Sequence, residues 1–218
     1  MTPGGKETLQ TRERLLKVAA RLFATEGYRG TTIADICRHA RANIAAVNYH
    51  FTSKEQLYRE AWRYAFQQSI QRHHPDGEIP ETAPVEERLR GRIRALICRV
   101  TDRNNLEFQI VQKELAQPTG LLREVQREAL APLRKNMEAL IREILGPEVS
   151  EEEIHFCQMS VMAQCLGPMA GRHGRSSRHS CQPFWSRNRK ALAAYVEHVV
   201  AFSLGGLKEI RRLHERKR

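Results

Sequence analysis

The segment ANIAAVNYHFTSKE, residues 42–55, gathers side chains that can bind a nucleic acid. The amide of Asn48 matches the edge of adenine in a bidentate pair of hydrogen bonds. Tyr49 and His50 offer donors to phosphate oxygens, and Lys54 stands at a helix start, where unpaired backbone N–H groups already favour an anion. The alternative is that Tyr49 and His50 are ordinary packing residues of a short helix.

To read bases, these side chains need a short helix that is held rigidly. Asn43 is a good N-cap for a helix over residues 44–50, and we expect Val47 and Phe51 to face inward and brace it. The outer side then carries Ile44, Ala45, Ala46, Asn48 and Tyr49. The small residues at positions 45 and 46 allow the backbone to approach DNA closely.

Hydrophobic periodicity and capping patterns predict helices on both sides of this segment. From Thr11 to Gly27 the apolar positions recur in steps of three and one, and Gly27 ends that helix. Thr32 and Asp35 form a capping box for a second helix of about two turns. A linking helix follows from about 53 to 73. This order is typical of a helix-turn-helix, whose second short helix enters a major groove.

The rest of the chain also has a helical pattern, with no convincing strand. After the turn-rich residues 73–84, helices are expected at roughly 85–102, 105–116, 119–145, 150–170 and 188–215. Pro132 should kink or split the third of these. The sequence thus predicts an all-α fold, in which a three-helix, homeodomain-like helix-turn-helix domain (1–61) precedes a larger helical domain (62–218).

Charge and composition limit the possible functions. The 218 residues carry a net charge of +11, distributed as +4 over residues 1–60, −2 over 61–170 and +9 over 171–218. A basic surface favours a polyanionic partner, although a merely solvated basic face is the alternative. Because the chain shows neither a membrane-spanning apolar run nor a secretory signal, we expect it in the cytoplasm, without a membrane partner.

Enzyme and metal chemistry find little support in the sequence. It has no Gly-rich phosphate loop, no G-x-S-x-G and no H-E-x-x-H, so we expect neither an enzyme nor a cofactor. His173, His179 and Cys181 match no standard zinc spacing, and a solvated loop is the favoured interpretation of residues 171–190. The five cysteines, Cys37, Cys98, Cys157, Cys165 and Cys181, are expected to be reduced.

Two stretches, ATEGYRGTTIADICRHA (24–40) and VNYHFTSKEQLY (47–58), resemble the DNA-binding domain of the TetR/AcrR family of bacterial transcription regulators. The resemblance covers residues 11 to about 61, with several fixed spacings. Two positions depart from the usual pattern. Arg41 stands where the family has a turn glycine, and Asn48 stands where the commonest pattern has tyrosine, with Tyr49 one place later.

The resemblance implies roles for individual residues. Phosphate contacts are implied for Thr31, Thr32, Tyr49, His50 and Lys54. A second group would face the groove, namely Asn43, Ile44, Ala46 and Asn48. We add Arg41 as a base or phosphate contact, on the expectation that its side chain points outward from the turn.

The run KELAQPTGLLREVQREALAPLRKNMEALIREILG (113–146) resembles the C-terminal domain of the CecR-like (YbiH-like) subgroup of this family, as do CQMSVMAQCLG and YVEHVVAFSLGGL further on. The resemblance implies a homodimer formed through the helices at about 150–170 and 188–215. It also implies an interior pocket for a small-molecule inducer. The apolar residues of the two last helices suit an interface, although some of them can pack within one subunit.

The pocket candidates are polar groups embedded in apolar helices and the apolar residues around them, namely Phe108, Gln109, Lys113, Glu114, Leu121, Met137, Phe156, Met162 and Gln164, together with Gln158. Each of these can instead be a plain core or surface residue. The sequence therefore predicts a one-component regulator, by default a repressor, that binds a pseudo-palindromic operator in double-stranded DNA as a homodimer and leaves it when an inducer binds. The competing hypothesis is a ligand-binding or scaffold protein whose helix-turn-helix has lost DNA binding and serves only as packing.

Overall fold

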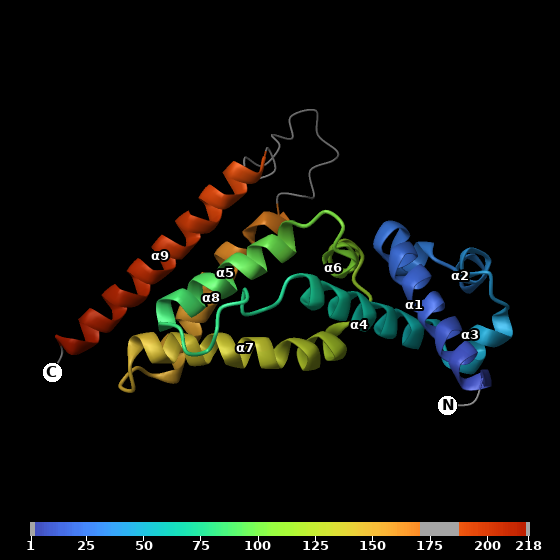
Figure 1. The fold of residues 1–218 in the computed structure, drawn as a ribbon, viewed down its shortest axis with the longest axis horizontal. Helices are drawn as coiled ribbons and strands as arrows, with labels where there is room; N and C mark the ends of the chain where they lie inside the picture. The colour runs from blue at the N-terminus through green and yellow to red at the C-terminus, as the bar shows by residue number, and fades with distance from the viewer. Residues whose placement is uncertain (1–2, 171–187, 217–218) are drawn as a thin grey trace. The chain divides into compact units, whose positions relative to one another are not determined.

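The computed structural model describes residues 3–170 and 188–216, whose regular structure is entirely helical (Figure 1). The helices are α1 (Pro3–Gly30), α2 (Ile33–Ala40), α3 (Ile44–His50), α4 (Lys54–Arg72), α5 (Val85–Thr101), α6 (Leu106–Ala116), α7 (Arg123–Leu145), α8 (Glu151–Ala170) and α9 (Arg189–Glu215). The predicted all-α fold is confirmed. None of these helices pairs the length of a bilayer span with enough apolar residues.

The first helix differs most from its predicted bounds. It begins at Pro3 rather than at Thr11, and its helical assignment runs on to Gly30 across a break at Gly27. Gly27 has φ 75° and ψ 176°, a conformation that a residue without a Cβ adopts at little cost. The regular helix therefore does end at Gly27 as expected, and residues 28–30 form a separate turn.

Capping residues set the helix starts as the sequence predicted, with one variation. The backbone N–H of Asp35 donates to Thr32 Oγ1 (3.1 Å), and that of Ala46 donates to Asn43 Oδ1 (2.7 Å). At the start of α4 the N–H of Gln56 donates to Ser53 Oγ (3.2 Å). The side chain of Gln56 reaches one residue further back, accepting from the N–H (2.7 Å) and the hydroxyl (2.8 Å) of Thr52.

Pro132 does not split α7, which runs from Arg123 to Leu145 as one helix. A proline leaves the carbonyl four residues earlier without its helical donor, and here that carbonyl belongs to Glu128. Both Pro132 and Glu128 are exposed, so water can satisfy the orphaned oxygen. Of the two expected outcomes, a split is wrong, and a kink at Pro132 stays a prediction.

The chain forms two compact units, one comprising Met1–Arg72 with Asn104–Leu130 and the other His73–Arg103 with Ala131–Arg218. The first unit is larger than the helix-turn-helix domain expected at residues 1–61. It includes α6 because α6 packs against both α1 and α4. The functional division at residue 61 stays a prediction.

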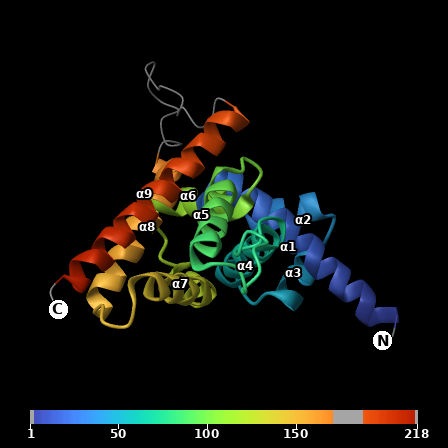
Figure 2. The ribbon, with the colours of Figure 1, turned by 60° about the vertical axis from the view of Figure 1, so that its left-hand side comes forward.

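Each unit has its own core. In the first, Phe23, Tyr58 and Trp62 are buried, and the rings of Phe23 and Tyr58 meet edge to face with centroids 4.8 Å apart. In the second, aliphatic residues of α5, α7, α8 and α9 form one cluster that includes Ile93 and Val200. Figures 1 and 2 show α8 and α9 side by side along this cluster.

The cysteines follow the expectation where the structure describes them. Cys37, Cys157 and Cys165 are buried, Cys98 is half-buried, and all four are free thiols. Burial raises the pKa of the Cys165 thiol to about 12, so this thiol stays protonated. Cys181, with the candidate ligands His173 and His179, lies outside the described residues.

Glu114, at the end of α6, has a structural role that the sequence did not reveal. Its carboxylate accepts hydrogen bonds from the hydroxyl of Tyr58 (3.1 Å), from the N–H (2.8 Å) and hydroxyl (2.9 Å) of Thr119, and from the N–H of Gly120 (2.8 Å). The group fixes the turn after α6 and ties that turn to α4. Glu114 is therefore not a free polar group awaiting a ligand, as the sequence-based list of pocket residues supposed.

Glu114→Gln should destabilise the protein. Both carboxylate oxygens accept hydrogen bonds, and glutamine replaces one of these oxygens with an N–H₂ group, which cannot accept them. We expect the free energy of unfolding to fall by about 1.5–3 kcal/mol, the range for hydrogen bonds to a charged group. Chemical denaturation at fixed protein concentration measures this change in the free energy of unfolding. The exposed Glu26→Gln is the control and should change stability by less than about 0.5 kcal/mol. Equal effects of the two variants would contradict this role for Glu114.

Candidate nucleic-acid interface

The short helix α3 has one buried face and one exposed face. Val47 and Phe51 are each 1% exposed, whereas Ile44 is 55% and Tyr49 77% exposed. Asn48 is exposed next to Tyr49. The predicted brace and the predicted outer face are thus both present. The Tyr49 ring stays mostly in solvent on this helix of 7 residues, although its edge meets the neighbouring His50 ring.

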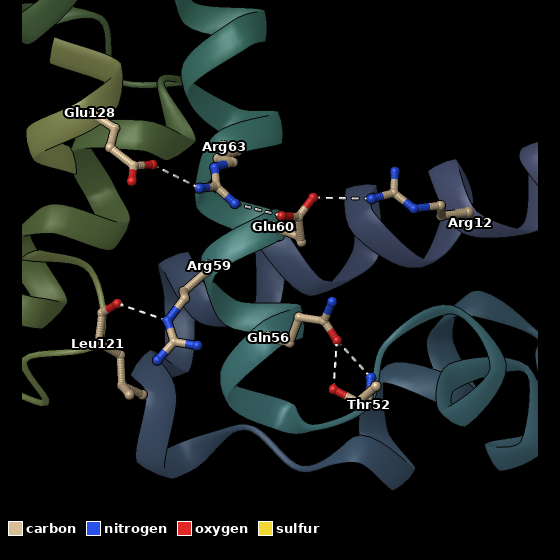
Figure 3. Close-up of polar contacts among 8 residues, drawn as sticks. All are labelled: Arg12, Thr52, Gln56, Arg59, Glu60, Arg63, Leu121 and Glu128. Atoms are coloured by element: carbon tan, nitrogen blue, oxygen red, sulfur yellow. Dashed lines mark hydrogen bonds and ion pairs between the residues drawn. The ribbon is translucent and has the colours of Figure 1, made fainter. Parts of the chain in front are cut away.

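Two interactions hold the end of α3 in place. The N–H of Phe51 donates to the carbonyl of Val47 (2.7 Å), which closes the last turn. The guanidinium of Arg12 lies 5.4 Å from the centroid of the Phe51 ring, in a cation–π contact. Arg12 also pairs with Glu60 of α4 (3.0 Å; Figure 3). One side chain therefore connects α1, the end of α3 and α4.

Further polar contacts fix α4, which begins immediately after the α3 segment. Figure 3 shows Glu60 between Arg12 and Arg63, and Arg63 in turn reaching Glu128 at 3.2 Å. On the same helix, Arg59 Nε donates to the carbonyl of Leu121 (3.2 Å). The sequence did not reveal these positioning residues, because charged residues on exposed helix faces carry no sign of their distant partners.

The turn between α2 and α3 explains the first departure from the family pattern. Arg41 has φ 49° and ψ 49°, the left-handed conformation that glycine adopts without strain. For a residue with a Cβ this costs about 1–2 kcal/mol. The turn keeps its hydrogen bond from the N–H of Ala42 to the carbonyl of Cys37 (3.0 Å). The side chain of Arg41 is exposed, as expected for a base or phosphate contact.

Thr31 and Thr32 differ in what they offer to a phosphate. Thr31 is only 1% exposed and its hydroxyl donates to the carbonyl of Gly27 (2.8 Å), so we withdraw it as a side-chain contact. It serves instead to fold the turn after α1. Thr32 is exposed and caps α2 with its hydroxyl oxygen. The capping-box pattern marked Thr32 as the helix cap, but no local pattern indicated that the adjacent Thr31 would be buried.

An aromatic and charged cluster surrounds Lys54. Its ammonium lies 4.3 Å from the centroid of the Tyr28 ring, and burial lowers its pKa. The Tyr28 hydroxyl donates to Glu55 (2.6 Å). That hydrogen bond, with a further one from Ser53, lowers the pKa of Glu55 to about 2, so the carboxylate stays charged near neutral pH. Lys54 is thus held in one place at the start of α4.

His50 and Asn43 complete the set of predicted contacts. Burial, followed by the positive charge of Arg12, lowers the pKa of His50, which favours its neutral form. Its ring meets the Tyr49 ring edge to face at 5.0 Å between centroids. Asn43 is exposed but uses its side-chain oxygen as a cap, and Ala46 is half-buried beside it. Nine of the ten predicted contacts therefore lie on the surface or partly exposed, with Thr31 as the exception.

The predicted inducer residues are divided between the two compact units, and their assignment to one pocket stays a prediction. Phe108, Gln109, Lys113, Glu114 and Leu121 belong to the first compact unit, and Met137, Phe156, Met162 and Gln164 to the second. Phe108 and Met137 are buried, Lys113 and Phe156 are exposed, and the others are half-buried. The amide of Gln158 donates to the carbonyl of Arg134 (3.0 Å), so this group serves packing. Among the described residues no cluster of three metal-ligating side chains occurs.

Comparison with known proteins agrees with this geometry. Residues 15–61 match the family model of the bacterial regulatory proteins of the tetR family. Residues 85–207, more than half of the chain, match the model of the C-terminal domain of the HTH-type transcriptional dual regulator CecR. The exposed face of α3 and its buried brace lie inside the first match.

Individual relatives extend the comparison. The dual regulator CecR of Shigella flexneri is 22% identical over 173 residues, covering 75% of this chain and 77% of that protein. A probable acrEF/envCD operon repressor of Escherichia coli is 36% identical over 69 residues, or 31% of each chain. Both are transcription regulators and neither is an enzyme.

Solved structures share the fold. A TetR-family regulator from Mesorhizobium loti has a TM-score of 0.68 at 18% identity, with 96% of this chain and 98% of that one covered. AibR, solved with isovaleryl coenzyme A and operator DNA, has a TM-score of 0.64 at 21% identity, with 88% and 97% covered. Together with the two family models, these matches identify the chain as a DNA-binding transcription regulator of the TetR family, with a C-terminal domain of the CecR type.

Proposed function

We propose that this regulator acts as a homodimer, binds a pseudo-palindromic operator through α3 and leaves it when a small molecule binds the helical domain. The observation that carries the proposal is the outer face of α3, which exposes Ile44, Asn48 and Tyr49 while Val47 and Phe51 anchor the helix. A short helix that is rigidly held and exposed on one face can deliver side chains to base edges in the major groove. We take residues 1–61 as the DNA-binding part and 62–218 as the regulatory part.

On the operator, Asn48 and Ile44 face the major groove, and Arg41 reaches a base or a phosphate from the turn before α3. Thr32, Tyr49, His50 and Lys54 hold the flanking phosphates. Such contacts fix the protein on the duplex, whereas the groove-facing residues carry the sequence preference. The cation–π contact on Tyr28 keeps Lys54 near the helix start, which already favours an anion.

The surface formed by α8 and α9 supports a second copy as the partner. Phe156 and Met159 on α8 and Phe202 on α9 are 54–65% exposed, and a groove of about 360 Å³ lies between the two helices. The hydroxyl of Ser203 is buried beside this groove without a hydrogen-bond partner among the described residues. Pairing these helices across a two-fold axis would cover the rings, and a pseudo-palindromic operator requires the two α3 helices of such a dimer to lie about 34–36 Å apart.

Two similar proteins support a proposal for the direction of regulation. AibR was solved with both a coenzyme A ester and operator DNA, and the acrEF/envCD relative is described as a repressor. We propose repression as the default for this chain, and release by an inducer that binds the two states unequally. Because its partner is chromosomal DNA, we place the protein in the cytoplasm.

Two substitutions in the interface should separate base reading from phosphate binding. Asn48→Ala should cost about 1–3 kcal/mol on the preferred operator and change the ranking of operator variants. Lys54→Gln should weaken binding to every sequence alike. It should also reduce the slope of log K against log salt by about 0.9 for each lost phosphate contact, or about 2 for a dimer. Fluorescence anisotropy at several salt concentrations measures both effects.

Lys54→Arg is the matched control, since it keeps a cation over the Tyr28 ring. It should retain most of the salt slope. If Asn48→Ala and Lys54→Gln both left operator binding unchanged, α3 would not be the DNA-reading helix. If a genome-wide selection found no site that the wild-type protein binds better than random DNA, the scaffold hypothesis would be favoured.

Phe202→Glu should dissociate the dimer, because it places a charge where an aromatic ring is expected to be covered. Analytical ultracentrifugation at micromolar concentration should show a monomer, and operator affinity should fall because two half-sites are no longer linked. Thr82→Glu adds the same charge at an exposed loop position of the same unit and should stay dimeric. A dimeric Phe202→Glu protein would exclude this surface as the interface.

A further inference from the structure

The second compact unit holds a cavity of about 350 Å³ that none of the predicted inducer residues lines. Its walls come from the loop between α4 and α5, from α5 and from α7, and its apolar part consists of Ile79, Ala139 and Leu140. Small-molecule sites usually have volumes of about 300–1,000 Å³, so the cavity suits a small ligand. The cavity is separate from the groove between α8 and α9.

The loop wall is held by close backbone contact. Gly77 has φ 65°, and a Cβ added there would lie 2.4 Å from the carbonyl oxygen of Gly91 on α5. A Cβ on Gly91 would in turn meet the carbonyl oxygen of Asp76 at 2.6 Å. The two glycines thus let the loop lie directly on the helix, and Arg94 donates to the Gly77 carbonyl (3.3 Å). The wall needs no ligand to form.

The charges that line the cavity leave one carboxylate uncompensated. Arg92 pairs with Asp76 (2.7 Å), and Arg88 pairs with Glu143, so these four groups cancel. Glu81 also lines the cavity, yet no side chain among the described residues gives it a hydrogen bond or an ion pair. The cavity therefore combines an apolar patch with a net negative charge at its rim.

We propose that this cavity binds a small organic cation, a protonated amine with a short hydrocarbon body. The ammonium group pairs with Glu81 and donates to the side-chain oxygen of Asn136, which also lines the site. The hydrocarbon body covers Ala139 and Leu140. A carboxylate ligand would lie beside Glu81, and the guanidinium groups of both arginines already form ion pairs with Asp76 and Glu143. This site goes beyond the proposed function, because binding here requires neither DNA nor the predicted inducer residues.

A series of equal length and different charge tests the proposal on the full-length protein without DNA. Hexylammonium, hexanol and hexanoate are titrated by isothermal calorimetry, with methyl NMR of Ile79 and Leu140 to locate the binding. We expect saturable binding of hexylammonium, weaker binding of hexanol and none of hexanoate. Hexanoate binding as tightly as hexylammonium would overturn the proposal.

Two variants and a control assign the binding to this cavity. Glu81→Gln should weaken hexylammonium about fivefold, the loss expected for a partly exposed ion pair. Glu87→Gln removes the same charge from an exposed position outside the cavity and should bind as the wild type. Ala139→Phe should fill the site and abolish binding, and circular dichroism checks that its helices persist. Unchanged affinity in Glu81→Gln or Ala139→Phe would exclude the site, whatever the outcome of the operator experiments.

Discussion

The burial of Val47 and Phe51 is the constraint on which the DNA-binding surface depends. An isolated helix shorter than about 12–15 residues is marginal in water, so α3, with 7 residues, cannot hold its shape alone. Each fully buried side chain of this kind contributes about 1.5–3 kcal/mol. The Asn43 cap at one end and the Arg12 contact at the other hold the rest of the helix. Its outer residues are therefore free for DNA rather than for packing.

The same unit connects this helix to α4 and α6 by charged pairs. Glu60 lies between Arg12 and Arg63, and Glu114 joins the end of α6 to Tyr58 (Figure 3 shows the first of these groups). Partly exposed ion pairs contribute little to stability individually, about 0–1 kcal/mol each. Here these ion pairs fix geometry rather than add stability. Because each guanidinium is bound by a carboxylate at a fixed position, the pairs set the direction in which α4 extends from the DNA-binding helices.

The second unit presents two different surfaces. The face of α8 and α9 is apolar and carries rings that are exposed in the described part of the chain, which suits a partner of the same kind. The cavity beside α5 and α7 is small and carries one unpaired carboxylate, which suits a small cation. The two surfaces differ in charge. A protein–protein interface disfavours an unpaired buried charge, whereas a ligand site can use one to select its ligand.

Local patterns in the sequence determined the helices, their caps and the inward direction of Val47 and Phe51. Such features depend on residues three or four positions apart, which periodicity and capping rules capture. Tertiary structure decided which polar groups were already occupied. Arg12 and Glu60 lie 48 positions apart, and Tyr58 and Glu114 lie 56 apart, so no local rule could pair them. Likewise, the capping rule identified Thr32 as a cap, but only the path of the chain at Gly27 decided that the hydroxyl of the adjacent Thr31 is buried.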